Sequence, residues 1–133
     1  MAPLLLRARR RDGGPGFGCV AALNYADSLA RLSRFEEAKS LLRKTMPVAR
    51  RVLGDSHEDT LRLKWIYGEA LYCDTDATLD DLREAVTTLE DAGRITRRVL
   101  GGTHPVSTGI ERFLQTARAG LRARETPPSP SSA

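Results

Sequence analysis

The most constraining feature of this sequence is a short segment that occurs twice. Residues 50–54 read Arg-Arg-Val-Leu-Gly, and the same five residues return at positions 97–101, an offset of 47. A histidine follows three residues after each copy, as His57 and His104. Internal periods of about 34–47 residues built from helix pairs are typical of helical solenoids. In a solenoid each unit buries its apolar face only by stacking on the next unit.

Each copy reads as the end of one helix followed at once by the start of another. The arginine pairs suit the negative end of a helix dipole, and glycine takes the left-handed backbone of a helix C-cap without strain. We therefore expect Gly54 and Gly101 to end helices, and Ser56 and Thr103 to cap the helices that follow. The chain should turn sharply between two helices at both places.

Composition favours helices and argues against nucleic-acid binding. Aromatic residues make up only 5% of the 133 residues, so the core must rest on aliphatic side chains. The formal net charge is +4, and the four arginines and one aspartate of residues 1–18 account for +3 of it. The remaining chain is nearly neutral, whereas phosphate binding needs a basic stripe on a folded face. Nucleic acid is thus an unlikely partner.

Cysteine content and hydropathy bear on the compartment. Cys19 and Cys73 are too few for a disulfide framework and are consistent with a reducing compartment, so we expect a cytoplasmic protein. No apolar run approaches the roughly 20 residues needed to cross a bilayer, and no membrane insertion is expected.

Apolar residues recur at helical spacing from Val20 onward and define two hairpins. In the first, the stripe ending at Leu32 is separated by Ser33 and Arg34 from a second stripe that begins at Phe35. Pro47 should bend this second helix. When the second hairpin is aligned with the first, its first helix matches at an offset of 42 residues and its second helix at an offset of 47. The second hairpin therefore contains five inserted residues. The insertion must be the polar segment 74–78, a loop whose last residue, Thr78, can form a capping box with Asp81.

A third unit begins at residues 103–105 and consists of one helix with an apolar stripe from Ile110 to Leu121. The sequence predicts an all-α, short right-handed helical-hairpin solenoid of about two and a half repeats with disordered ends. The expected segments are a lead-in 1–18 rich in Arg and Gly, repeat 1 at 19–54, repeat 2 at 55–101, a closing helix at 102–124 within a domain of 19–124, and a Pro/Ser tail at 125–133.

Several segments resemble the tetratricopeptide repeats of kinesin light chains and their relatives. They are Leu23-Asn24-Tyr25-Ala26, the turn at residues 34–38, and the junction at residues 52–61, which reads Val-Leu-Gly-Asp-Ser-His-Glu-Asp-Thr-Leu. The resemblance covers about residues 20–121. It implies a repeat module that binds protein, without implying motor transport.

Enzymatic and metal-binding interpretations have little support in the sequence. His57, His104 and the two cysteines lie dozens of residues apart, whereas metal ligands usually cluster at spacings of two to five. The acidic residues near position 76 lack the central glycine and final glutamate of a calcium loop, and no serine sits in a nucleophile elbow. We expect no catalytic residue, no metal site and no cofactor, with each histidine bonding locally at a helix start.

The resemblance implies a concave groove lined by the first helices of successive repeats. If Ala26 and Gly68 are the small residues at the close approach of paired helices, side chains at fixed positions around them face the groove. The candidate groove residues are Asn24, Asp27, Arg31, Arg62, Trp65, Ile66, Glu69 and Cys73, with Arg112 and Thr116 from the third helix. Asn24 is the strongest candidate, because an amide can donate to and accept from a peptide backbone at once.

Two functions of different classes remain open at this point. The first is a non-enzymatic scaffold or adaptor that binds a peptide segment in the groove, with some preference for acidic peptides from Arg31 and Arg62. The alternative is a regulatory fragment attached to a catalytic or nucleic-acid partner through its basic N-terminus. Because solenoids usually need about three repeats for stability, we also expect marginal folding assisted by self-association or a partner.

Overall fold

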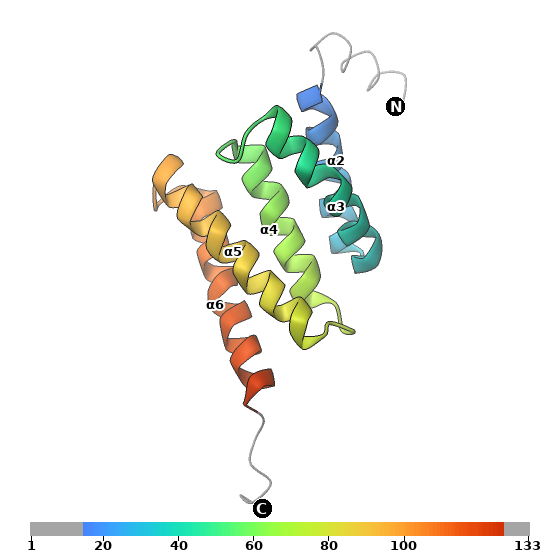
Figure 1. The fold of residues 1–133 in the computed structure, drawn as a ribbon, viewed down its shortest axis with the longest axis vertical. Coiled ribbons are helices and arrows are strands. Elements are labelled where there is room, and N and C mark those ends of the chain that lie inside the picture. Colours follow the sequence, from blue (N-terminus) through green and yellow to red (C-terminus); the bar gives the residue numbers. More distant parts are fainter. Residues whose placement is uncertain (1–14, 127–133) are drawn as a thin grey trace, which may run out of the picture.

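The computed structural model describes residues 15–126, which form helices and no strands. In chain order the helices are α2 (Pro15–Arg31), α3 (Phe35–Val52), α4 (Glu58–Cys73), α5 (Leu79–Val99) and α6 (Pro105–Glu125). Figure 1 shows α2 and α3 at one side, α4 in the middle, and α5 and α6 at the other side. Each helix packs on the next one along the chain, and α4 also contacts α2 and α6. The described part is an all-α helical repeat solenoid, as expected.

The start of α2 differs from the expected boundary. The lead-in was expected to reach Gly18, but α2 begins at Pro15. Proline is favoured in the first turn of a helix because its missing N–H has no partner there in any case. Cys19, one turn later, is only 2% exposed and belongs to the core, which holds the first turns of α2 against the body. The rest of the lead-in, residues 1–14, and the tail at 127–133 lie outside the described residues, while α6 runs one residue past its expected end.

The two junctions turn as expected but are capped by different residues. Gly54 and Gly101 have φ angles of 93° and 92°, the left-handed conformation predicted for helix C-caps. Ser56 and Thr103 do not cap, because α4 and α6 begin later along the chain, at Glu58 and Pro105. The residue directly before each helix is the histidine, and its Nδ1 accepts the N–H of the second helical residue at 3.0 Å in one case and 3.1 Å in the other. The expectation that each histidine bonds locally at a helix start is confirmed.

The first hairpin closes with a tight turn. Leu32, Ser33 and Arg34 separate α2 from α3, and Ser33 takes a left-handed φ of 60°. The turn is held by the backbone N–H of Arg34, which donates to the carbonyl of Leu29 at 2.9 Å. α3 then continues without interruption through Pro47.

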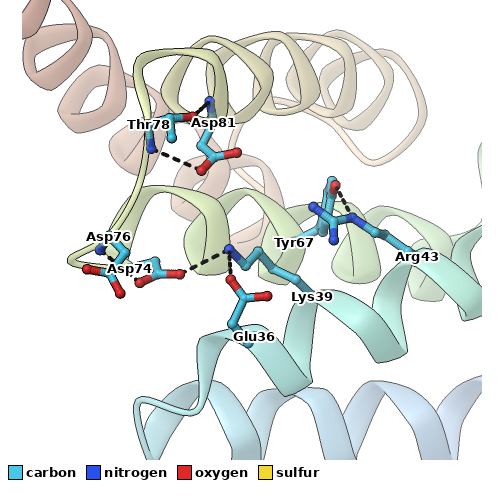
Figure 2. A network of polar contacts seen from close by, with 8 residues as sticks. All are labelled: Glu36, Lys39, Arg43, Tyr67, Asp74, Asp76, Thr78 and Asp81. Atoms are coloured by element: carbon cyan, nitrogen blue, oxygen red, sulfur yellow. Dashed lines mark hydrogen bonds and ion pairs between the residues drawn. The ribbon is translucent and has the colours of Figure 1, made fainter.

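The second hairpin closes with the inserted loop, residues 74–78, at the predicted place. Thr78 and Asp81 form the expected capping box, with reciprocal bonds of 3.1 and 3.0 Å (Figure 2). At the other end of the loop, the carboxylate of Asp74 accepts the backbone N–H of Asp76 at 3.0 Å.

The inserted loop is packed against α3 and α6, although its polar residues predict a loop on the surface. Lys39 of α3 is buried, with its side chain only 4% exposed, and its ammonium donates to Asp74 at 3.0 Å and pairs with Glu36 at 3.0 Å (Figure 2). On the other side, the guanidinium of Arg124 in α6 donates to the carbonyl of Ala77 at 3.4 Å. The loop therefore links the first hairpin to the closing helix.

Close helix packing depends on small residues at the positions expected. Ala26 is fully buried between the helices of the first hairpin. A Cβ added to Gly68 would lie only 2.8 Å from Cγ of Leu89, so α4 and α5 approach too closely for any side chain there. These two contacts set the spacing of the paired helices and so the position of the surface that α2 and α4 share.

Candidate functional site

The candidate site is a cavity of about 430 Å³ between α2 and α4, called here the α2–α4 groove. It is lined by Leu23, Asn24, Asp27 and Arg31 of α2 and by Arg62, Trp65, Ile66 and Glu69 of α4. Residues three, four and seven apart share one face of a helix, which explains why each helix contributes a single stripe. Seven of the ten residues predicted from the sequence line this cavity.

Asn24 lies at the groove with its amide unpaired. The residue is exposed, and its side chain makes no hydrogen bond to the described part of the chain. An amide carries two donors and one acceptor carbonyl, so the groove offers both kinds of group to a ligand. Leu23 of α2 and Ile66 of α4, only 7% and 8% exposed, add apolar side chains to the lining.

The two arginines of the groove are already paired within their own helices. Nε of Arg31 lies 3.0 Å from the carboxylate of Asp27, and Nη2 of Arg62 lies 2.8 Å from that of Glu58. Both are pairs four residues apart in exposed positions, where such contacts contribute only a few tenths of a kcal/mol, about 0.3–0.5. Because the nearby carboxylates offset both positive charges, the expected preference for acidic peptides is weak.

Glu69 is the groove residue whose carboxyl group has a shifted pKa. Burial raises the pKa of its carboxyl above the ordinary value, and the negative charge of Asp27 raises it further. The indole N–H of Trp65 and the charge of Arg31 act in the opposite direction on this pKa. The Trp65 N–H does not reach hydrogen-bond geometry and is buried without a partner among the described residues. A ligand that donates to Glu69 would relieve the cost of holding its charge.

Trp65 closes the groove on the side of α6. A Cβ added to Gly109 of α6 would lie 2.2 Å from Cη2 of Trp65, so the indole ring rests directly on the glycine backbone. A second contact of the same kind places Tyr72 on Gly120 of α6, and Tyr72 also meets Phe113 edge-on with ring centroids 5.5 Å apart. The side chains of Trp65 and Tyr72 therefore occupy the space between α4 and α6.

Three predicted residues are not brought to the groove. Cys73 is exposed at the end of α4, beside the inserted loop. Arg112 lines a separate cavity of about 300 Å³ over α6, and Thr116 is exposed, with its hydroxyl donating to the carbonyl of Arg112. The ring of Trp65 fills the space in which a side chain of α6 would have to lie to reach the groove. The alignment that predicted Arg112 and Thr116 in the groove does not account for this ring.

Leu23 lines the groove and was not predicted. It precedes Asn24 and lies four residues before Asp27, so the helical spacing itself could have identified it. Leu23 is both a core residue and part of the lining of the groove.

The described residues present neither a metal-binding cluster nor a membrane-spanning helix. They contain no group of three or more His, Cys, Asp or Glu side chains placed to hold a metal ion. Cys19 is buried and Cys73 exposed, and both are free thiols. None of the described helices combines the length and the apolar character that a membrane span requires.

Comparison with known proteins places a recognised repeat over the groove. A family model described as tetratricopeptide repeat matches residues 19–77, which contain nearly all of α2 together with α3, α4 and most of the inserted loop. The match supports a tetratricopeptide repeat protein. No curated protein and no solved structure matches the chain. Tetratricopeptide repeats generally mediate protein–protein interaction and are typically non-catalytic, and the matched residues include every residue of the α2–α4 groove.

Proposed function

We propose that this tetratricopeptide repeat protein is a scaffold or adaptor of the kinesin light chain-like type that binds an extended peptide segment in the α2–α4 groove. The observation that carries the proposal is the unpaired amide of Asn24 at a cavity that is also lined by the apolar side chains of Leu23 and Ile66. An extended peptide presents one donor and one acceptor per residue, and the amide of Asn24 can pair with both. The apolar wall of Leu23 and Ile66 would take a side chain of the peptide.

The charged residues of the groove would set orientation more than affinity. Asp27 and Glu69 line it together with Arg31 and Arg62, so charges of both signs are available to a bound segment. Exposed pairs of this kind add little energy but penalise a misplaced like charge. We expect peptides with separated acidic and basic residues to bind better than uniformly acidic ones. The two free thiols are consistent with action in a reducing cytoplasm.

A binding screen tests the proposal. A library of peptides with mixed sequence is exposed to the wild type and to the Asn24→Ala, Arg62→Ala double variant, with a Ser40→Ala variant on the exposed surface of α3 as the matched control. We expect the double variant to lose at least about tenfold in affinity, which corresponds to 1.4 kcal/mol, while the control binds like the wild type. Circular dichroism confirms that all three fold. Equal binding by the wild type and the double variant would remove the α2–α4 groove as the site.

A further inference from the structure

The N-terminal side of the solenoid carries an apolar surface that no described residue covers. Among the described residues, five large hydrophobic side chains are exposed, and four of them lie on the first hairpin. They are Tyr25 (58% exposed) on α2, Leu32 (66%) directly after the end of α2, and Val48 and Val52 on α3. The fifth, Val99, stands alone at the end of α5.

The second hairpin shows what such a face does when it is covered. The offset of 42 residues between the first helices matches Tyr25 with Tyr67. Tyr67 is only 4% exposed because α3 lies over it, and its hydroxyl accepts from Arg43 at 3.1 Å and donates to Glu84 at 2.7 Å. Tyr25 therefore occupies the position on α2 at which α4 receives the preceding helix. This face is a helix-packing surface on which none of the described helices packs as α3 packs on α4.

The exposed face of α2 has an unusual order of side chains. The residues at spacings of four, three and four along it are Ala21, Tyr25, Ser28 and Leu32, and none of them is charged. The two charged residues of the exposed part of α2, Asp27 and Arg31, line the groove instead. Small and large side chains alternate along the face, in the order small, large, small, large.

We propose that the occupant of this face is a second copy of the same chain, packed with its α2 antiparallel across a two-fold axis between Tyr25 and Ser28. In that register Ala21 faces Leu32 of the second copy, and Tyr25 faces Ser28 of the second copy. Every large side chain then meets a small one, which close packing of helices requires. A surface that is complementary to itself in this way forms a closed dimer.

The opposite end of the solenoid does not offer an alternative partner surface. The outer face of α6 exposes Arg112, Gln115 and Arg122, and none of the large hydrophobic side chains exposed in the described residues lies on it. Terminal repeats need such a polar outer face for solubility. Head-to-tail stacking would place this polar face against Tyr25 and Leu32, so the two-fold pairing is favoured over an open chain. It also specifies the surface for the self-association expected from the sequence.

Sedimentation equilibrium of the full chain tests the dimer and its register. We expect a dimer in the wild type and in Val99→Glu, which alters the exposed apolar residue outside this face. Leu32→Glu should weaken dimerisation at least about tenfold, since it sets a charge against an apolar surface. Ala21→Lys combined with Leu32→Glu should restore the dimer, because the two new charges face each other between the copies in the antiparallel register.

The outcomes separate this inference from its rivals and from the proposed function. A wild type that stays monomeric at high concentration would overturn it, and so would a dimer unaffected by Leu32→Glu. A failure of the added lysine to rescue would overturn the register. A monomer whose melting midpoint falls with Leu32→Glu would show that another part of the same chain, or a further helix, covers the face. The groove variant Asn24→Ala, Arg62→Ala should dimerise normally, so peptide binding and dimerisation can fail independently.

Discussion

The two hairpins follow the same plan, yet α2 and α4 lie in very different surroundings. α4 contacts all four other described helices, whereas α2 contacts only α3 and α4. The aligned tyrosines show the result, since Tyr67 is buried and bonded while Tyr25 is exposed. The burial of a residue in a solenoid thus depends on whether a neighbouring unit is present and not on the residue itself.

The largest expected effect comes from giving the second hairpin the turn of the first. Replacing residues 74–78 by the three residues Leu-Ser-Arg that join α2 to α3 removes Asp74 and the Thr78 cap and leaves the buried ammonium of Lys39 with only the exposed Glu36. We expect a loss of about 3 kcal/mol, near the lower end for breaking a buried ion pair. Urea unfolding followed by circular dichroism measures it.

A point substitution in the same loop is the control for this exchange. Thr75 is exposed and its side chain makes no hydrogen bond in the described residues, so Thr75→Ala should unfold at the wild-type midpoint. An unchanged midpoint in the exchanged hairpin as well would mean that Lys39 finds water or another partner at no cost, and that the loop is a simple surface insertion.

The next prediction compares the stability cost of substituting the small buried residue of each hairpin, Gly68 and Ala26. Gly68→Ala places a methyl group 2.8 Å from Leu89, which is fully buried and has little room to move. Overpacking of this kind costs about 1–3 kcal/mol, partly offset by the better helix propensity of alanine. The reverse change, Ala26→Gly, should cost about 2 kcal/mol, because it lowers helix propensity and removes a fully buried methyl group. Stabilisation by Gly68→Ala would show that α5 can shift away from α4.

The tyrosine hydroxyls give a smaller effect. Tyr67→Phe removes the group that joins Arg43 of α3 to Glu84 of α5, and we expect a loss of about 1 kcal/mol. Both partners are exposed enough to turn to water, which keeps the loss modest. Tyr25→Phe should leave the unfolding free energy of the monomer unchanged. Similar losses in the two variants, measured in dilute solution where the chain is monomeric, would contradict the contrast between covered and uncovered helices.

The last contrast is a pH dependence of opposite sign in two carboxylates. Burial raises the folded-state pKa of Glu69, so its contribution to stability is present below its unfolded pKa and is lost as the pH rises through the folded pKa. Asp74 behaves in the reverse way, because the Asp76 N–H and then Lys39 lower its pKa, and its contribution is lost as the pH falls through that value.

Thermal melting between about pH 3 and 8 can separate these two contributions. Glu69→Gln should be more stable than the wild type at neutral pH, with the difference vanishing at acidic pH. Asp74→Asn should be less stable at neutral pH and approach the wild type as the solution becomes acidic. A Glu69→Gln variant that is destabilised at neutral pH would indicate that the charged carboxylate holds Trp65 or Arg31 in place.

The sequence predicted the fold well because its signals are local. The repeated junction located both glycine caps, and the difference between the two offsets located the inserted loop. The prediction of Ser56 and Thr103 as helix caps was wrong, because the choice between them and the histidines depends on a one-residue shift of the helix start. The packing of the loop was missed for another reason: Lys39 lies 35 residues from Asp74, and spacing carries no signal for that contact.

The sequence predicted groove residues on α2, α4 and α6, and the cavity is lined by residues of α2 and α4. Helical spacing fixes which residues share a face, and Asn24 and Glu69 do line the same cavity. It does not say what fills the space between two helices, and there the large ring of Trp65 meets the missing side chain of Gly109. Such a contact joins residues of two different units and appears only when the helices are in place.

The position of Trp65 gives the molecule an optical probe of its own. It is the single tryptophan of the chain, and its ring touches both the α2–α4 groove and the backbone of α6 at Gly109. Undocking of α6 would admit water to the indole and shift its emission to longer wavelength, while a segment entering the groove would alter its contact with Glu69. The unmodified protein can therefore report by its own fluorescence whether the closing helix is seated and whether the groove is filled.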